Sequence, residues 1–156
     1  MKRWRAGVAA LALLVAGAIS ARAEEPVVFE RSELTIETAA GEAHRFEVEV
    51  AQSMAQRARG LMFRESMAAD AGMLFVYPAE QQIRMWMKNT VIPLDMLFVA
   101  ANGRILGIAE DTVPFSEEVV ASSGPARAVI ELNGGTARRL GIRSGDRVRH
   151  PVFGGG

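Results

Sequence analysis

The pattern of apolar and polar residues along the chain predicts a series of short strands. Leu34 and Ile36 alternate with polar neighbours, and a second alternating run covers residues 45–50, after a break at residues 39–41. Alternation with a period of two is typical of strands that have one face in the core and one face in water. The two runs therefore predict a β-hairpin near the start of the folded domain.

A short helix is predicted over residues 54–59. Ser53 is followed three residues later by Gln56, which is the capping-box pattern, and Gly60 can adopt the left-handed conformation that ends many helices. A second helical turn is predicted over residues 136–140, where it would precede a glycine.

The other expected strands are apolar runs bounded by turn residues, at residues 73–77, 96–100, 104–108, 128–132 and around Val148. The Asn-Gly pair between the second and third of these runs is a strong hairpin signal. Residues 111–124 are largely polar and are predicted to form the longest loop. Together these elements predict a mainly β fold, either a compact sandwich or a distorted barrel of short strands with one or two short helices.

The stretch with the most informative polar residues is 85–98. Its apolar ends predict two strands joined by a bend, where Pro93 disfavours helix. Four polar residues interrupt the stretch, namely Lys88, Asn89, Thr90 and Asp95. A carboxylate among apolar neighbours is costly unless it is paired, hydrogen-bonded or open to a cleft. We therefore expect Lys88 to lie beside Asp95, as an ion pair that either braces the bend or forms part of a site.

The first 23 residues have the features of a secretory signal peptide. A basic start with Lys2, Arg3 and Arg5 precedes an apolar run over residues 6–19 and a small-residue cleavage site at Ala23. The alternative, a membrane anchor, is disfavoured because the apolar run is short and rich in alanine. The sequence thus predicts an exported protein, periplasmic or extracellular, with cleavage after Ala23 and no stable membrane anchor afterwards.

The remaining residues predict one β-rich domain over residues 24–153 and a flexible tail over residues 154–156. Cysteine is absent from the sequence, so no disulfide can support this domain. Four of the 18 basic residues lie in the signal peptide, which leaves 14 basic residues against 18 acidic residues and a net charge of −4. This balance argues against nucleic acid as a partner. No feature of the sequence indicates an oligomeric state.

Several classes of catalytic and metal site are disfavoured. His44 and His150 are the two histidines of the sequence, cysteine is absent, and no serine lies in a nucleophile-elbow motif. The glycine pair at residues 134–135 is not followed by the lysine of a phosphate-binding loop. We therefore predict no metal site and no cofactor.

A copper(I) site is the metal alternative that the sequence offers. Thioether sulfurs bind copper(I), and four methionines could provide them, namely Met62, Met73, Met85 and Met87. Methionine is also an ordinary core residue in apolar runs such as these. We therefore expect the four side chains to fill the core.

Acid–base chemistry needs titratable groups in different environments, and the candidates are Asp95, Glu131 and Lys88. If both carboxylates faced one cleft, desolvation and mutual repulsion would raise the pKa of one of them, and Lys88 would oppose that shift. Arg64 follows an apolar triplet, and we expect it to reach an internal carboxylate such as Asp95 or Glu131. A polar cluster beside Trp86 would also suit a small polar ligand.

Several motifs in a fixed order resemble the domain of unknown function 192 family. They lie at residues 57–64, 72–76, 86–90 and 92–95, and at Glu131 with the leucine and glycines that follow it. The resemblance covers about residues 46–148, and Met85 stands where the family pattern has phenylalanine. It implies a compact, mostly β, exported domain, and it brings no established activity or catalytic residue.

Two functions remain open from the sequence. The first is a binding module for a small polar ligand, such as a sugar or a component of the cell envelope, in a pocket around the bend. Its ligand-binding residues would be Arg64, Trp86, Lys88, Asn89, Asp95 and Glu131. The alternative is a hydrolase or transferase that uses Asp95 or Glu131 as general acid or base. The missing nucleophile and the missing metal ligands favour the binding module.

Overall fold

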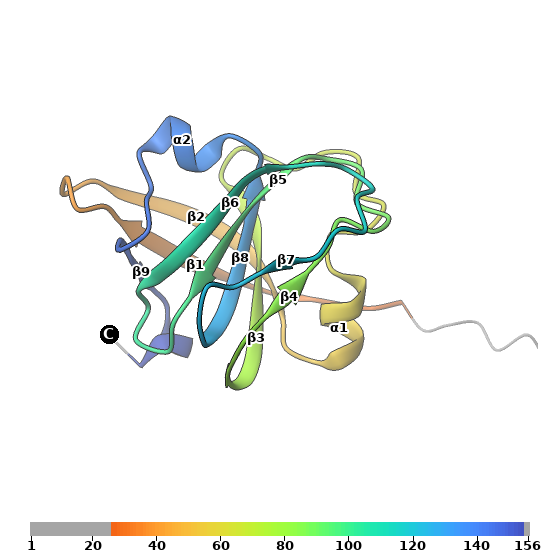
Figure 1. Ribbon diagram of the computed structural model, residues 1–156, viewed down its shortest axis with the longest axis horizontal. Coiled ribbons are helices and arrows are strands. Elements are labelled where there is room, and N and C mark those ends of the chain that lie inside the picture. The colour runs from red at the N-terminus through yellow and green to blue at the C-terminus, as the bar shows by residue number, and fades with distance from the viewer. Residues whose placement is uncertain (1–25, 155–156) are drawn as a thin grey trace, which may run out of the picture.

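Seven strands form one curled sheet at the centre of the protein in the computed structural model (Figure 1). The structure describes residues 26–154, so the predicted signal peptide and residues 155–156 of the predicted tail lie outside the described residues. The strands of the sheet are β1 (Glu30–Glu37), β2 (Ala43–Ala51), β3 (Ala71–Gln81), β5 (Leu94–Val99), β6 (Ile105–Thr112), β8 (Ala126–Asn133) and β9 (Arg147–Arg149). Their order across the sheet is β6-β5-β8-β3-β2-β1-β9. Neighbouring strands are antiparallel except β2 and β3, which are parallel.

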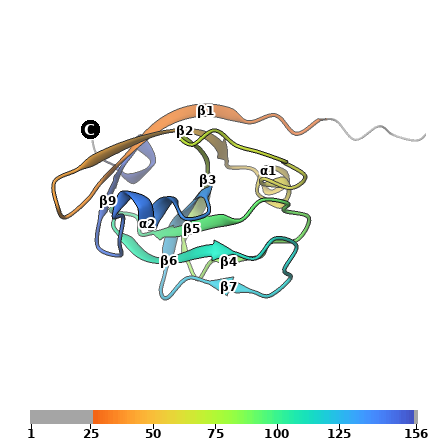
Figure 2. The same ribbon diagram turned by 90° about the horizontal axis from the view of Figure 1, so that it is seen from above.

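The two edges of this sheet approach each other at one end. The backbone N–H of Ile105, at the start of β6, donates to the carbonyl oxygen of Asp146 at 2.9 Å. The N–H of Gly145 donates back to the carbonyl oxygen of Ile105 at 2.8 Å, and the chain then enters β9 at the opposite edge. The sheet is therefore curled towards a barrel (Figure 2). The prediction of a mainly β fold with two short helices is confirmed.

Apolar side chains pack against both faces of the central strands. One core contains Leu34 and Ile130, and the other contains Phe75 and Val129. Adjacent residues of β8 thus enter different cores. Strands covered on both faces carry continuous apolar runs instead of alternation, which is the pattern that the sequence has in β3, β5 and β8. The outer hairpin of β1 and β2 has the predicted wet face.

The helices form where local signals place them. They are α1 (Met54–Arg59) and α2 (Thr136–Leu140), and η1 (Pro151–Phe153) is a single 3₁₀ turn. In the capping box before α1, the N–H of Gln56 donates to Ser53 Oγ at 3.1 Å, and the N–H of Ser53 donates to Gln56 Oε1 at 2.9 Å. Within residues 26–154, no helix is long and apolar enough to cross a bilayer.

The prediction of two strands within residues 85–98 is right for the second strand and right only in part for the first. β5 forms as expected, but the residues before the bend form only the short strand β4 (Arg84–Met85). β4 pairs with β7 (Val120–Ala121) outside the main sheet, and the N–H of Met87 donates to the carbonyl oxygen of Ser116 at 2.8 Å. The predicted loop at residues 111–124 therefore contains a strand, because its backbone bonds to the segment before the bend.

Candidate functional site

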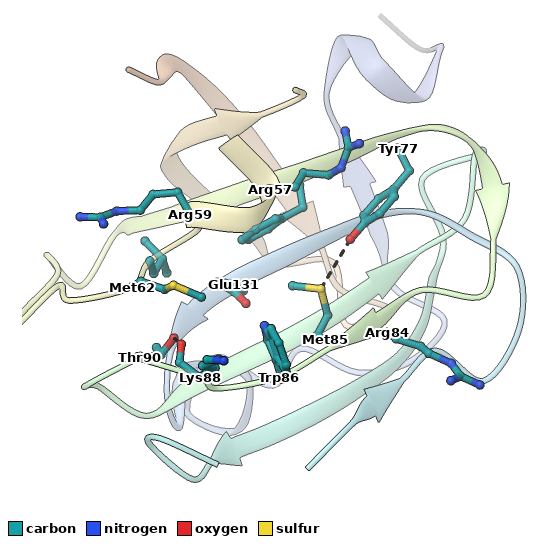
Figure 3. A pocket seen from close by; sticks show the side chains of 12 residues that line it. Arg57, Arg59, Met62, Tyr77, Arg84, Met85, Trp86, Lys88, Thr90 and Glu131 are labelled. Carbon is teal, nitrogen blue, oxygen red and sulfur yellow. Dashed lines mark hydrogen bonds between the residues drawn. The ribbon is translucent and has the colours of Figure 1, made fainter. Parts of the chain in front are cut away.

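A small cavity lies between α1, β3, β8 and the segment that contains β4 (Figure 3). Its volume is about 100 Å³. That is enough for a few water molecules or for one small polar group of a larger ligand. Its lining side chains come from residues 57–62, 75–77 and 84–90, and from Glu131. Segments that are distant in the sequence therefore meet around one carboxyl group.

Glu131 of β8 provides the acidic group of the cavity. Its residue is 4% exposed, and it pairs in the sheet with Met73 of β3 and Met96 of β5, so apolar side chains flank it on both sides. Burial is the cause that raises the pKa of Glu131 to about 8. Within residues 26–154, its carboxyl group has no ion-pair partner. The group therefore keeps its proton at neutral pH and can donate a hydrogen bond into the cavity.

Three aromatic side chains line the same cavity, namely Phe75, Tyr77 and Trp86. Tyr77 of β3 donates its O–H to Met85 Sδ at 3.7 Å, and a thioether sulfur is a weak acceptor. Burial raises the pKa of Tyr77, the nearby Arg57 partly offsets this, and Glu131 adds to it. Trp86 is 47% exposed, so much of its ring surface is accessible at the cavity. This wall therefore offers a hydroxyl donor inside and an aromatic surface at the opening.

Four cationic residues line the cavity, namely Arg57, Arg59, Arg84 and Lys88, and the guanidinium groups of Arg59 and Arg84 point away from Glu131 (Figure 3). Arg57 is fixed by the carbonyl oxygen of Val76 at 3.0 Å, and by that of Gln52. Lys88 Nζ lies 5.1 Å from the centroid of the Trp86 ring, which is within the range of a cation–π contact. The lining thus combines cationic residues, with Lys88 beside Trp86, and one acid that is protonated at neutral pH.

The turn after β4 holds Lys88 and Thr90 at the cavity. Three residues of this region have left-handed backbone conformations, namely Phe63 (φ 64°), Asn89 (φ 55°) and Phe115 (φ 61°). The N–H of Phe63 donates to the carbonyl oxygen of Asn89 at 2.8 Å, and that of Phe115 donates to Thr90 at 3.0 Å. Residues with a Cβ adopt such conformations at a cost, and only where surrounding contacts hold them. Backbone hydrogen bonds across three loops therefore fix the lining residues of this turn.

The expected ion pair between Lys88 and Asp95 does not form. Asp95 is fully buried at 0% exposure and accepts three backbone hydrogen bonds: from Asp111 at 2.8 Å, Gly135 at 3.0 Å and Ala137 at 2.8 Å. Helix α2 has no side-chain cap of its own, so the Asp95 carboxylate takes that place from a neighbouring strand. The three N–H groups satisfy the carboxylate and leave no need for a lysine.

Lys88 and Arg64 pair with other carboxylates instead of the predicted ones. Lys88 Nζ lies 3.6 Å from Glu117 Oε1 at the surface. Arg64 Nη2 lies 2.5 Å from Glu49 Oε2, so the expectation that it reaches Asp95 or Glu131 is wrong. The parallel pairing of β2 with β3 brings Glu49 to that position, and no local pattern in the sequence reports this pairing.

The six residues predicted as ligand-binding therefore divide into two groups. Trp86, Lys88 and Glu131 line one cavity. The other three do not line it. They are Arg64, Asn89 and Asp95. The side-chain amide of Asn89 donates to Met62 Sδ at 3.9 Å.

Several lining residues were not predicted, namely Arg57, Arg59, Tyr77, Arg84 and Thr90. Tyr77 is the single tyrosine of the sequence and closes an apolar strand, which is a signal that could have identified it. Tyr77 and Glu131 line the same cavity, on neighbouring strands β3 and β8. The arginines of α1 gave no such signal, since basic residues near the end of a helix are common.

Two of the four methionines considered for copper lie in the core as expected, and the other two line the cavity. Met73 and Met87 are buried in one apolar core, where Met87 Sδ also accepts a hydrogen bond from Thr112 at 3.1 Å. Met62 and Met85 line the cavity. Within residues 26–154, no three His, Cys, Asp or Glu side chains gather as a metal-binding group.

Comparisons with known proteins agree on the fold and give no activity. The family model DUF192, described as "Uncharacterized ACR", matches residues 35–150. No curated protein matches the chain. A crystal structure from Sinorhizobium meliloti 1021, described as a proposed transcription regulator, is 44% identical and has a TM-score of 0.80, with 82% of this chain and 99% of that chain covered. A protein of unknown function from Novosphingobium aromaticivorans DSM 12444 is 40% identical and has a TM-score of 0.76, with 82% and 91% covered.

Proposed function

Because the chain belongs to the DUF192 family, whose description records no activity, we propose from the cavity itself that the protein binds a small polar ligand. The ligand would place one polar group beside Glu131 and rest its body on Trp86. A sugar or a component of the cell envelope has this combination of polar groups and a flat surface. The proposal therefore names one site, at the cavity between α1, β3 and β4.

The observation that carries this proposal is the buried carboxyl group of Glu131. Burying such a group without a partner opposes folding, and an apolar side chain would remove that cost. Glu131 nevertheless lies at 4% exposure on the wall of a cavity. Groups that reduce stability in this way are typical of binding and catalytic sites. A ligand that accepts a hydrogen bond from Glu131 would provide the missing partner.

The test uses the methionine methyl groups as reporters. Met62 and Met85 line the cavity, whereas Met54 lies at the surface of α1 with 81% exposure. With ¹³C-methyl methionine in the chain, a screen of small neutral, anionic and cationic polar compounds by NMR should yield ligands that shift the Met62 and Met85 signals and leave Met54 unchanged. A screen in which no compound moves either cavity signal selectively contradicts the proposal.

A catalytic role is the second candidate, because Glu131 is protonated at neutral pH and could act as a general acid. Asp95 is a poor candidate for that role, since three backbone N–H groups hold its carboxylate. The same NMR samples separate the two functions. Conversion of a bound compound into a product, lost in Glu131→Gln while binding persists, would favour the enzyme.

Export is a separate proposal that rests on residues 1–23 alone. The basic start, the apolar run and the small residues before Glu24 support it. We expect protein made in a Gram-negative host to reach the periplasm with Glu24 as its first residue. Mass spectrometry of the N-terminal peptide after cell fractionation checks this, and intact chain confined to the cytoplasm contradicts it.

A further inference from the structure

We propose that the group entering the cavity is an anionic oxygen group, a carboxylate or a phosphate, held by donors that the protein leaves without a strong acceptor. This inference rests on the proposed function and names the chemical class of the ligand. It follows from a comparison of the hydrogen-bond donors and acceptors around the cavity, together with the charge of its opening.

Two hydroxyl donors on the wall of the cavity lack a strong acceptor. Among residues 26–154, the O–H of Tyr77 has the thioether of Met85 as its one hydrogen-bond partner, at 3.7 Å. Protonated Glu131 offers a second O–H within the same space. The sulfur atoms that line the cavity belong to Met62 and Met85, and sulfur accepts hydrogen bonds weakly. A ligand group that only accepts hydrogen bonds would therefore gain more here than one that donates them.

The charge of the residues at the cavity also favours an anionic ligand group. Arg59 and Arg84 are exposed and neither takes part in an ion pair within residues 26–154, but their guanidinium groups point away from Glu131 (Figure 3), so Lys88 is the more direct cationic partner for a bound anion. Lys88 has one carboxylate partner, Glu117, and that contact is at the surface, with the two side chains 44% and 64% exposed. Exposed ion pairs of this kind are weak, so an incoming anion can compete for the lysine. The remaining residues of the domain are net acidic, which makes this cationic opening stand out.

The size of the cavity agrees with this assignment. Its volume of about 100 Å³ accommodates a single small group and not a whole sugar ring. The rest of the ligand would lie outside, against Trp86, which is 47% exposed. Figure 3 shows Glu131, Tyr77, Trp86 and Lys88 around the same space. A ligand with an aromatic or other flat part and one anionic group could place the anionic group in the cavity and the flat part against Trp86.

The proposed complex also depends on pH, because an ionised Glu131 would repel the anion. The charged and titratable residues that line the cavity with Glu131 are Arg57 and Arg59 from α1, Tyr77 from β3, and Arg84 and Lys88 from β4 and its turn. The pKa of Tyr77 lies above its ordinary value of 10.0, and that of Glu131 is about 8. Glu131 therefore changes its charge between pH 6 and pH 9, a range that lies below the pKa of Tyr77.

The experiment compares four probes of similar shape on the full chain. They are benzoate, phenyl phosphate, the neutral isostere benzamide and the cation benzamidine, with the Met62 and Met85 methyl signals as the readout and Met54 as the control. At pH 7, benzoate or phenyl phosphate should bind at least about tenfold more tightly than benzamide, since hydrogen bonds to charged groups are the stronger ones. The two anions then distinguish a carboxylate from a phosphate ligand.

The pH series gives an independent result. Benzoate affinity in the wild type should be constant from pH 6 to pH 7 and fall about tenfold by pH 9, because the fraction of protein with protonated Glu131 falls by that factor. Glu131→Gln should bind benzoate without this pH dependence, because the amide stays neutral and keeps a donor.

Three outcomes overturn the inference. If benzamide or benzamidine binds as tightly as the anions, the inference is overturned and the proposed function stays in place. A wild-type pH profile that matches the Glu131→Gln profile also overturns the inference. Failure of all four probes overturns the inference, while a different ligand from the wider NMR screen would still support the proposed function.

Discussion

Replacing Asp95 by alanine should lower the free energy of unfolding by on the order of 4 kcal/mol, because it leaves three backbone N–H groups without an acceptor. Asp95 is 0% exposed. Its Oδ1 accepts from Asp111 and Gly135, and its Oδ2 accepts from Ala137. These bonds connect β5 to the end of β6 and to the start of α2, so the substitution loosens three elements together.

Urea unfolding of the wild type and the Asp95 variants measures this effect. Asp95→Asn keeps one carbonyl acceptor and should cost less than Asp95→Ala. Asp70→Asn is a matched control at an exposed position, and its unfolding free energy should stay within about 0.5 kcal/mol of the wild type. An Asp95→Ala variant as stable as the control would show that the carboxylate does not brace the fold.

Lys88→Met belongs in the same series, since the sequence alone suggested that Lys88 and Asp95 stabilise each other. Lys88 contacts Glu117 at the surface instead, with the two side chains 44% and 64% exposed. Exposed ion pairs contribute from about zero to 1 kcal/mol. The lysine variant should therefore lose less than about 1 kcal/mol, and a loss equal to that of Asp95→Ala would contradict the observed pairing.

Glu131 should make the protein less stable as the pH rises from 4.5 to about 8. Its pKa is raised from 4.5 to about 8 in the folded protein, so the unfolded chain releases a proton that the folded chain retains between these values. Below pH 4.5 both states are protonated, and above about pH 8 both are ionised, so the change is confined to that interval. At about 1.4 kcal/mol per pH unit, the stabilisation lost across it is about 4–5 kcal/mol.

Glu131→Gln removes this loss because the amide does not ionise. At pH 7 the variant should be more stable than the wild type by about 2–3 kcal/mol, after allowance for the cost of burying the amide. Unfolding curves at pH 5, 6, 7 and 8 measure the difference, which should grow with pH. Glu65→Gln, at an exposed position, should follow the wild type. Parallel curves for wild type and Glu131→Gln would mean that Glu131 is not protonated in the folded protein at neutral pH.

Local patterns were enough to predict most elements of this fold, with β7 and the extent of β4 as the exceptions. The capping box of Ser53 and Gln56 places α1 at residues 54–59, and the Asn-Gly pair at residues 102–103 places the β5–β6 hairpin. These signals work because the residues involved lie within a few positions of each other. The backbone geometry that they favour depends little on the rest of the protein. The motifs that resemble the family are short segments of the same kind, and the family match confirms them.

Pairing between distant segments could not be predicted in this way. The residues before the bend pair with β7 and not with the main sheet, and the parallel pairing of β2 with β3 brings Arg64 to Glu49. Each contact depends on which strand lies next to which. That arrangement is decided by the packing of both cores around the central strands.

The two carboxyl groups show what the sequence and the tertiary structure each determined. In the sequence, Asp95 and Glu131 are alike: each is an acid within an apolar strand, and each was a candidate for the site. The sequence therefore determined that two costly acids enter the core region. The folded chain directs three backbone N–H groups at Asp95 and a cavity at Glu131. Asp95 is therefore a structural residue, whereas Glu131 keeps its proton and faces the cavity. The sequence could not separate them, because the hydrogen-bond partners of a buried acid come from distant segments.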